Sequence, residues 1–545
     1  MALAAELIGD KWVLLILREA FYGVCRYDDM RLDLDIPRAM LTDRLNRLVS
    51  DGLLERHAYQ EPGTRTRHAY ILTRKGRSLA LVMMALTQWG EAHLTGGDAP
   101  VAVIDRETSG ELRVGLSDEH GRTVPLERAI LSKRFAMRGI GALLGGLAFV
   151  SVVGPAAAAD VTVYPFQGAE RLIEALILAE EGDRITLGTG RFELTEGLSL
   201  TANGVTIRGS GPDRTVLSFA GQTGSGEGLL VTGDRVVLEN FAVEDTKGDG
   251  IKSKGADEII YRNLRVEWTN GPDESNGAYG IYPVESEHVL VDGVTVSGAS
   301  DAGIYVGQSR NIIVRNSTAM FNVAGIEIEN SFNADVYGNT ATRNTGGILI
   351  FDLPDLPQQG GRDIRVFDNE VFDNDTHNFA PPGNIVGIVP KGMGIMVMAN
   401  RNVHVFNNRL SGNDTAHVLI AAYPNEYDDE NYMFVPRGVF VHDNEFGEGG
   451  NAPDGEVGKT ISDVSGVPVP DIVWDGVTRI PEWLTWVAPE NRLYIDEAED
   501  TTFVNLRMLN QIILPWSSKP LRDKDAHAGS LPEPAPVQLP QDAAS

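Results

Sequence analysis

The sequence of 545 residues contains a single cysteine, Cys25, and 10 histidines. One cysteine excludes a disulfide within the chain and any zinc or iron–sulfur site built from several cysteines. Basic residues are scarce after residue 160, and because residues 1–136 are balanced, the net charge of −29 belongs to the second half. This acidity predicts that the second half is soluble and repels nucleic acid.

A chain of this length is too long for one hydrophobic core and predicts two or three domains. The junction lies at residues 133–159, where Lys133, Arg134 and Arg138 precede an apolar run, 139–154, that ends in proline and alanines. A basic start, an apolar core and small residues are typical of a secretory signal peptide. Two alternatives are a membrane anchor, because the run approaches the roughly 20 residues that span a bilayer, and a buried helix.

We divide the chain into a first domain at residues 1–95, a short β extension or linker at 96–132, the signal or anchor at 133–159, a repeat domain at 160–510 and a tail at 511–545. The tail is rich in proline and alanine, which predicts disorder. A signal in mid-chain is unusual because export machinery reads N-termini, so the simplest interpretation is that two adjacent reading frames have been joined.

The first domain is predicted to be α+β. Apolar residues recur at helical spacing near its start, and Pro37 suits the first turn of a helix over residues 38–50. Alternating segments at 53–56 and 69–72 predict two strands around a loop. Residues 73–94 predict a closing helix that can pair with a second copy. Helices followed by two strands and their loop predict a winged helix-turn-helix.

Basic residues are concentrated on the second helix and the loop of this domain. An exposed helix face of this kind can enter the major groove of DNA, while a basic loop meets phosphates or the minor groove. The alternative is an ordinary solvated basic surface. The candidate DNA-binding residues are Arg38, Thr42, Arg44 and Arg47 on the helix and Arg65 and Arg67 on the loop.

The segments LIGDKW and LLILRE, followed by PRAMLTDRL and DGLLER, resemble the HxlR family of bacterial regulators. The resemblance covers residues 5–95 and implies a homodimeric winged-helix transcription factor that binds DNA, often in response to redox or electrophilic signals. The cysteine typical of the family precedes the first helix, and Cys25 stands elsewhere. Cys25 is therefore either a sensing thiol or, by default, a packing residue.

The second half is built from internal repeats, which predict a solenoid. A Gly-Ile pair recurs at Gly280, Gly303, Gly325 and Gly347, at intervals of 22 or 23 residues. A second register places a ladder of polar residues at one turn position: Ser317, Asn339, Asn369, Asn408 and Asn444. Asparagine tolerates left-handed backbone, and stacked amides can bond from coil to coil. A β-sandwich has no reason to repeat at fixed length, so we predict an all-β, right-handed parallel β-helix, capped by a helix at 169–181.

In the Gly-Ile strands, alternate residues should point away from the core. Aligning the repeats then places Lys252, Tyr282, Tyr305 and Glu327 in one column, with neighbouring coils roughly 4.8 Å apart. Aromatic rings flanked by charges suit a sugar chain, and lysine can neutralise a uronate. The alternative is an ordinary face with scattered aromatics. Inserts at 270–276, 352–361 and 373–391 are placed to wall this face.

Catalysis is a further step that no spacing diagnoses. Weak candidates for acid, base or charge-stabilising roles are Asp249, Lys252, Asp301, Glu327, Glu329 and Asp352, with Asp355, and His377 or His417 as a proton shuttle. No metal site is predicted and no cofactor is required. The many acids would allow Ca²⁺ to bind the β-helix, but solvation of its surface is the default role.

The segments KGDGIK, SDAGIYVGQS, AGIEIEN and IFDLPDLP look like a bacterial family of exported parallel β-helix repeat proteins over residues 165–510. Its broader relatives include pectate lyases, polygalacturonases and alginate epimerases, which implies lyase, epimerase or hydrolase chemistry on polysaccharide if the domain is an enzyme. The Asp-Pro-His-Asp motif of the epimerases and the Gly-His-Gly motif of the polygalacturonases are absent. Enzyme activity thus rests on analogy of fold.

Three hypotheses follow. In the first, a cytoplasmic regulator and an exported β-helix, periplasmic or extracellular, that binds or modifies polysaccharide are two products joined in one chain. In the second, the chain is a single-span sensor, with the winged helix inside and the β-helix outside, and it meets the membrane through residues 139–159. In the third, the β-helix is a structural or adhesion module without chemistry.

Overall fold

A computed structural model describes residues 8–93 except 22–23, 35, 60–66 and 78, residues 114, 116–117 and 123–124, and residues 158–540 except 225, 424, 480–486 and 509–518. The chain divides into two units, residues 1–149 and 150–545. The predicted signal or anchor lies outside the described residues apart from its last two positions. Among the helices that the structure describes, none is long and apolar enough to cross a membrane.

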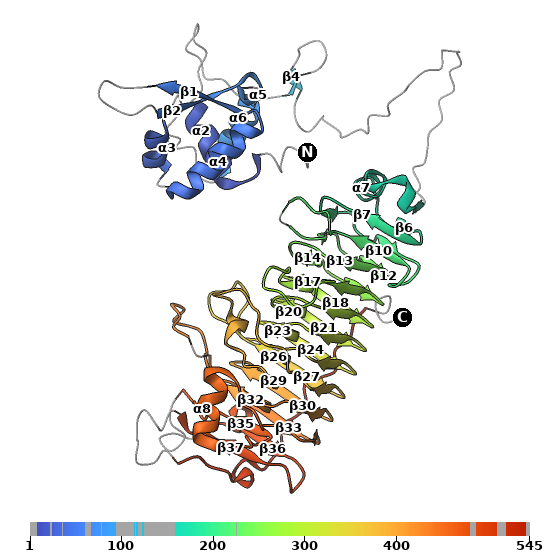
Figure 1. The fold of residues 1–545 in the computed structure, drawn as a ribbon, viewed down its shortest axis with the longest axis vertical. Helices are drawn as coiled ribbons and strands as arrows, with labels where there is room; N and C mark the ends of the chain where they lie inside the picture. Colours follow the sequence, from blue (N-terminus) through green and yellow to red (C-terminus); the bar gives the residue numbers. More distant parts are fainter. Residues whose placement is uncertain are drawn as a thin grey trace. The chain divides into compact units, whose positions relative to one another are not determined.

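In residues 8–93 of the first unit, the structure describes three helices, then a β-hairpin and two further helices (Figure 1). Its elements are α2 (Lys11–Phe21), α3 (Tyr27–Leu34), α4 (Arg38–Ser50), β1 (Leu54–Tyr59), β2 (Arg67–Leu72), α5 (Arg74–Arg77) and α6 (Ala80–His93). β1 and β2 pair antiparallel, and apolar residues of α2, α4 and the hairpin form one core. The predicted α+β winged-helix fold is therefore confirmed.

One helix of this unit differs from its prediction. The expected helix over residues 73–94 is divided into α5 and α6. The Thr73 hydroxyl donates to the carbonyl of Gly52 at 2.6 Å and accepts from the amide of Gly76 at 3.0 Å. These bonds tie α5 to the end of the hairpin, and α6 begins separately. Farther along, β3 (Leu116–Ser117) and β4 (Thr123–Val124) pair antiparallel within the predicted β extension.

The second unit is a parallel β-helix whose strands form three sheets (Figure 1). Sheet 1 has 12 strands: β5 (Asp160–Val163), β6 (Arg184–Leu187), β9 (Thr206–Arg208), β12 (Val237–Glu239), β15 (Ile260–Arg262), β18 (Glu287–Asp292), β21 (Arg310–Arg315), β24 (Phe332–Tyr337), β27 (Arg362–Phe367), β30 (Arg401–Phe406), β33 (Arg437–His442) and β36 (Leu493–Asp496). Sheet 2 has 10 strands: β7 (Gly190–Glu193), β10 (Thr215–Ser218), β13 (Ala242–Glu244), β16 (Arg265–Glu267), β19 (Thr295–Ser297), β22 (Thr318–Met320), β25 (Thr340–Thr342), β28 (Glu370–Phe372), β31 (Arg409–Ser411) and β34 (Glu445–Phe446). Sheet 3 has 11 strands: β8 (Leu198–Leu200), β11 (Leu229–Val231), β14 (Ile251–Lys254), β17 (Tyr279–Val284), β20 (Ala302–Gly307), β23 (Ala324–Glu329), β26 (Gly346–Phe351), β29 (Met393–Met398), β32 (Ala416–Ala421), β35 (Ile472–Trp474) and β37 (Phe503–Asn505).

Helical elements lie at the ends of the β-helix and in its loops. They are α7 (Ala169–Ile177), α8 (Gly455–Ser465) and the 3₁₀ turns η2 (Pro165–Gln167), η3 (Ile385–Ile388), η4 (Pro489–Asn491) and η6 (Lys524–His527). Leu172 and Leu176 of α7 are buried in the main core. α7 therefore covers the N-terminal end of the solenoid, as its sequence predicts, because an open end would leave apolar coil residues in water.

The predicted polar ladder is present inside the turn between sheets 1 and 2. The Asn339 amide donates to Oδ1 of Asn369 at 3.0 Å, Asn369 donates to Asn408 at 2.9 Å, and Asn408 donates to Asn444 at 2.9 Å. The left-handed backbone that was expected at the ladder residues is found at the residue before each of them, for example at Asp368 and Asn407. The ladder side chains are buried because the preceding residue makes the turn.

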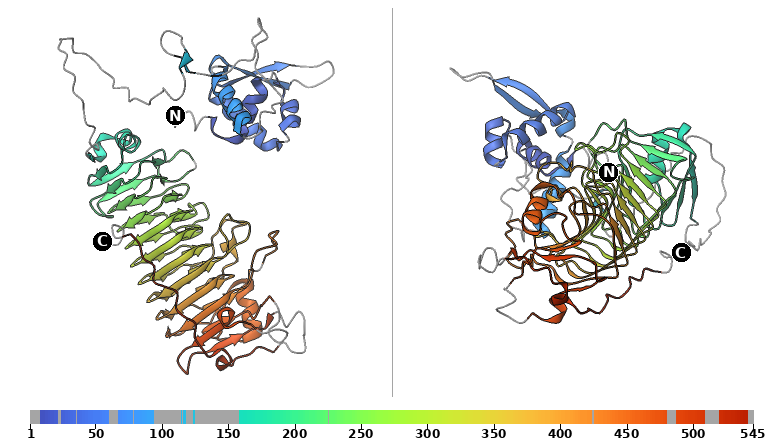
Figure 2. Two further views of the ribbon diagram at one scale, coloured as in Figure 1. Left: turned by 180° about the vertical axis from the view of Figure 1, so that it is seen from behind. Right: turned by 60° about the horizontal axis from the view of Figure 1, so that its bottom comes forward.

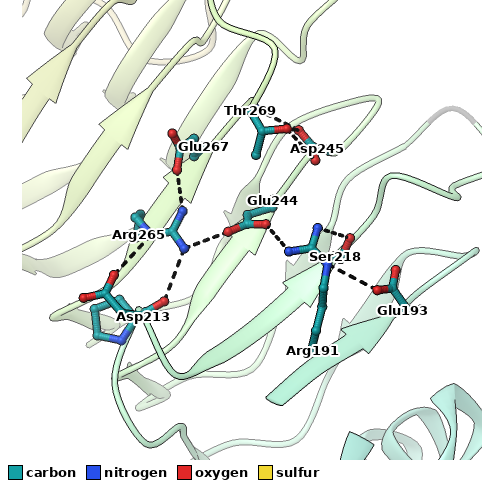
Figure 3. Close-up of polar contacts among 10 residues, drawn as sticks. Arg191, Glu193, Asp213, Ser218, Glu244, Asp245, Arg265, Glu267 and Thr269 are labelled. Atoms are coloured by element: carbon teal, nitrogen blue, oxygen red, sulfur yellow. Dashed lines mark hydrogen bonds and ion pairs between the residues drawn. The ribbon is translucent and has the colours of Figure 1, made fainter. Parts of the chain in front are cut away.

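The outer face of sheet 2 carries a charge network in the first coils (Figure 3). Glu244 accepts from Arg191 at 2.5 Å and from Arg265 at 2.7 Å. Arg191 also donates to Ser218 at 2.7 Å, and Arg265 pairs with Glu267. Arg191, Glu244 and Arg265 each have a partner from another coil, so the network joins coils.

The tail was predicted to be disordered, but the part of it that the structure describes is ordered. Residues 519–540 run back along sheet 1 (Figure 2). Val537 packs against Ile260 and Leu290, and its amide donates to Asp335 at 3.0 Å. Glu533 pairs with Arg365 at 2.6 Å. The segment contains the 3₁₀ turn η6, and outward-facing apolar residues of sheet 1 supply a surface on which it packs.

Candidate functional sites

The exposed face of α4 holds part of the predicted DNA-binding set. Leu41, Leu45 and Leu48 of this helix are buried, whereas Arg38, Thr42 and Arg47 are exposed.

Tyr27 of α3 helps to fix that face. Its hydroxyl donates to the carbonyl of Arg38 at 2.9 Å and lies 3.0 Å from the hydroxyl of Thr42. The sequence provided no reason to select Tyr27, because its spacing does not indicate a contact with α4.

Arg44 is engaged inside the domain. Its guanidinium donates to both carboxylate oxygens of Asp10, each at 3.2 Å, and Asp10 in turn accepts from the amide of Val13 at the start of α2. The hydrogen bond to Asp10 raises the pKa of Arg44 above its usual value. Arg44 therefore links α4 to α2. Of the predicted wing residues, Arg65 lies outside the described residues and Arg67 is the first residue of β2.

An apolar face of α6 is exposed to solvent in the first unit. The exposed fractions are 66% for Leu81, 49% for Leu86 and 58% for Trp89. Three large apolar residues on successive turns of one helix are an unusual surface for a monomeric domain and are typical of an interaction face.

In the β-helix, the pairing register places Lys252 beside Tyr282 and Tyr305 beside Glu327, and Ile281 beside Ile304. The four predicted residues thus occupy one column on sheet 3, in the order that the repeat alignment predicts. Tyr305 points away from the main core, as predicted, but it does not reach solvent: Tyr305 is 4% exposed, and Glu327 is fully buried. Tyr305 belongs to a second hydrophobic cluster, which outward-facing residues of sheet 3 form together with residues of inserted loops.

Three tyrosines, two from this column and Tyr279 beside it, form a compact aromatic cluster. The ring centroids of Tyr279 and Tyr282 are 4.4 Å apart, those of Tyr279 and Tyr305 are 4.5 Å apart, and those of Tyr282 and Tyr305 are 5.0 Å apart. The ammonium of Lys252 lies 4.5 Å from the Tyr282 ring centroid. Tyr279 was missed in the sequence because it precedes the Gly-Ile pair, outside the positions that the repeat alignment assigns to the outer face.

Carboxyl groups surround the tyrosines. The Tyr305 hydroxyl donates to Oε1 of Glu329 at 2.6 Å, and the amide of Asn384, from the insert at 373–391, donates to Asp301 at 3.0 Å. Burial, and next the negative charge of Glu329, raise the pKa of Asp301 to about 7. Burial likewise raises the pKa of Glu329 to about 7, against the opposing hydrogen bond from Tyr305.

Glu327 is the most deeply buried acid of the cluster. Within the part of the chain that the structure describes, neither of its carboxylate oxygens has a hydrogen-bond partner. Burial, with the nearby charges of Asp301 and Glu329, raises its pKa well above the usual value. The raised pKa favours the protonated form of Glu327, which is buried rather than on an open face.

The remaining acidic candidates lie around this cluster with partners of their own. Asp249 accepts from Lys252 at 3.3 Å, and Lys252 also pairs with Glu227 at 3.4 Å. Burial raises the pKa of Asp249. Asp352 accepts from the amide of Gly361 at 2.7 Å, and burial raises its pKa to about 6.

Neither histidine candidate lines the pocket beside the tyrosines. His417 is buried and lies 3.2 Å from the amide of Asn413, where it ends a second asparagine ladder through Asn322, Asn344 and Asn374 that the sequence analysis did not anticipate. His377 is exposed.

The three tyrosines, Asp301 and Glu329 line one pocket of roughly 440 Å³ on the outside of sheet 3. Its wall includes Leu353–Leu356 of one predicted insert and Asn384 and Ile385 of another, whereas the insert at 270–276 borders a separate groove near Trp268. The residues that line the pocket are Tyr279, Tyr282, Asp301, Tyr305, Gln308, Glu329, Leu353, Pro354, Asp355, Leu356, Asn384, Ile385, Tyr423 and Glu426. Within the described residues no group of three or more His, Cys, Asp or Glu has the arrangement of a metal site.

Two family models match the chain: HxlR-like helix-turn-helix over residues 7–98 and right handed beta helix region over residues 195–355. An uncharacterised HTH-type transcriptional regulator of Mycobacterium tuberculosis is 43% identical over 108 residues, which cover 20% of this chain and 67% of that protein. The HTH-type regulator YtcD of Bacillus subtilis is 34% identical over 90 residues, which cover 16% of this chain and 70% of that protein.

Solved structures resemble each unit separately. A Pseudomonas aeruginosa protein described as a transcription factor is 37% identical, with a TM-score of 0.20 over 25% of this chain and 92% of its own. The lacto-N-biosidase of Eubacterium ramulus is 13% identical, with a TM-score of 0.40 over 63% of this chain and 67% of its own. An exopolygalacturonase of Thermotoga maritima is 11% identical, with a TM-score of 0.38 over 63% of this chain and 90% of its own.

Proposed function

Residues 7–98 of this chain belong to the HxlR-like family of helix-turn-helix proteins, and on that premise we propose that the first unit is a transcriptional regulator that binds DNA as a homodimer. The observation that carries the proposal is the exposed surface of α4, to which Arg38, Thr42 and Arg47 belong, while the leucines of the same helix are buried. Such a face supplies both phosphate and base contacts in a major groove.

The exposed apolar face of α6 supports the dimer. Leu81, Leu86 and Trp89 gain burial only if another surface covers them, and a second copy of α6 offers a matching apolar surface. Two winged helices held in this way can read two half-sites.

Binding is tested by fluorescence anisotropy of the full chain with duplex DNA at several salt concentrations. Replacing Arg38 and Arg47 with alanine should weaken binding and reduce its salt dependence, because each lost phosphate contact lowers the number of released counterions. Arg171→Ala in α7, which removes one positive charge from the other unit, is the control. Equal affinity of the double variant and the control would reject α4 as the DNA-binding helix.

For the second unit we propose that the pocket on sheet 3 binds part of a polysaccharide chain. The observation that carries this is the tyrosine cluster at one cavity together with Asp301 and Glu329. Aromatic rings provide apolar surface for the face of a sugar, and carboxyl groups bond its hydroxyls.

A catalytic role is a second candidate, favoured by one observation. The pKa values of Asp301 and Glu329 are both raised to about 7, so either group can hold or release a proton near neutral pH, as general acid–base catalysis requires. Glycan cleavage followed by chromatography of the products would distinguish catalysis from binding. Asp301→Asn should abolish cleavage while a glycan is still retained.

We also propose that the β-helix is exported and the regulator stays in the cytoplasm, as the pattern of residues 133–159 supports. Antibodies against each unit, applied to fractionated cells, test this. Separate bands in cytosol and periplasm or medium would support two products, whereas a single full-length band in the membrane would favour the one-chain sensor.

A further inference from the structure

The charged side chains that line the pocket on sheet 3 are all acidic among the described residues. Asp301, Glu329, Asp355 and Glu426 line it, and no lysine, arginine or histidine does so among the residues that the structure describes. The cation in the neighbouring coil is Lys252, which is already held by Asp249 and Glu227 and packs on the Tyr282 ring. A ligand in this pocket therefore meets negative charge without a compensating positive charge from the wall.

One acceptor of the pocket lacks a hydrogen-bond partner. Gln308 lines the wall, and its Oε1 is buried without a partner within the described part of the chain. Two donors of the site are already engaged, since the Tyr305 hydroxyl binds Glu329 and the Asn384 amide binds Asp301. A ligand group that donates hydrogen bonds therefore suits this part of the wall.

The tyrosines offer a matching surface for a cation. A ring face attracts an ammonium group electrostatically, and the contact between Lys252 and Tyr282 shows one such ring already accepting a cation on one side. Tyr279 and Tyr423 also line the pocket. An ammonium group here would meet ring faces and carboxylates together.

We propose that the pocket selects a polysaccharide whose sugars carry free amines, so that a protonated amine enters among Asp301, Glu329 and Gln308. This rests on the proposed saccharide-binding function and specifies its ligand. A uronate chain is disfavoured because its carboxylates would add negative charge to a site without a free cation. A divalent cation is a weaker fit, because the described acids do not converge as metal ligands.

The proposal is tested by calorimetry of the full chain with oligomers of β-1,4-linked glucosamine and with the same oligomers fully N-acetylated. The two share a backbone and differ in charge and in donor capacity. The amine form should bind at least tenfold more tightly. At pH 6, where Asp301 and Glu329 hold protons, its binding should release protons, because a nearby cation favours the ionised carboxylate. Titrations in two buffers of different ionisation enthalpy measure that release.

The possible outcomes distinguish selection of an amine from binding of a saccharide in general. Equal affinity for both oligomers would overturn the amine selection and leave saccharide binding standing, whereas no binding of either would overturn both. Tight binding of oligogalacturonate, or of CaCl₂ alone in competition with the amine oligomer, would also overturn the selection. Glu329→Gln should remove the preference, so that the two oligomers bind this variant with similar affinity. If that variant does not fold, Asp355→Asn on the exposed loop should reduce the preference.

Discussion

The phenolic oxygen of Tyr305 lies 2.6 Å from Oε1 of Glu329, and both residues are almost completely buried. The two side chains come from adjacent strands of sheet 3, β20 and β23. The hydroxyl donates to an acid whose pKa is raised to about 7 by burial, and its hydrogen bond opposes that rise. This pair connects the aromatic cluster to the acidic wall of the pocket.

Tyr305→Phe should destabilise the β-helix by about 1–3 kcal/mol, the cost of leaving a buried acceptor unpaired. It should also raise the pKa of Glu329 further, because the hydroxyl no longer stabilises the ionised form. Thermal unfolding followed by circular dichroism at pH 6.5 and pH 8 measures both effects. The loss should be larger at pH 8, where the wild-type carboxylate is ionised, and an equal loss at the two pH values would contradict this account.

Stability of the β-helix should fall as pH rises from 6.5 to 8. Burial raises the pKa values of Asp301, Glu329 and Asp475 to about 7, whereas in the unfolded chain these groups are already ionised near pH 4. The folded state therefore binds more protons than the unfolded state in this window, so raising the pH favours unfolding. The buried histidines act in the opposite direction only at lower pH, since burial lowers the pKa of His404 to about 4.

Asp475→Asn supplies the matched variant for this pH effect. Asp475 is buried outside the tyrosine pocket and accepts backbone hydrogen bonds from the amides of Ala422 and Val477. Removing its charge should reduce the fall in melting temperature between pH 6.5 and pH 8 without changing saccharide binding. An unchanged pH dependence would show that Asp475 does not contribute.

Arg44→Ala should destabilise the winged-helix unit by about 1–2 kcal/mol, because Asp10 loses the partner that holds it at the start of α2. Arg38→Ala, on the exposed face of the same helix, should leave stability nearly unchanged and weaken DNA binding. Hydrogen exchange of residues 8–93 in the full chain, read by mass spectrometry, separates the two effects. Normal protection in the Arg44 variant together with weakened DNA binding would instead make Arg44 a direct contact.

Asn369→Ala should cost the solenoid at least about 2 kcal/mol. The Asn369 side chain accepts from Asn339 at 3.0 Å and donates to Asn408 and to the carbonyl of Val336, each at 2.9 Å. Its loss leaves several buried groups unpaired. The control is Asn316→Gly, which removes an exposed amide and retains a residue suited to left-handed backbone. Similar melting temperatures for the two variants would show that the ladder adds no stability.

The repeat spacing was sufficient to predict much of the second unit. The column that contains Lys252, Tyr282 and Tyr305 follows from the number of residues per repeat. Parallel coils place equivalent residues side by side regardless of what surrounds them. The asparagine ladder follows in the same way. In the first unit, the bounds of α4 were predicted because proline at one end and Asp-Gly at the other delimit the helix.

The sequence by itself thus determined the two folds, the register of the coils and which residues share a column. Only the tertiary structure decided that Glu327 is buried, that Tyr279 joins the aromatic cluster and that Asn384 reaches Asp301. It also decided that Arg44 binds Asp10 and that the tail packs on sheet 1. Periodic spacing specifies contacts between equivalent residues, whereas inserts and termini have no period, and their positions depend on the side chains they meet in space.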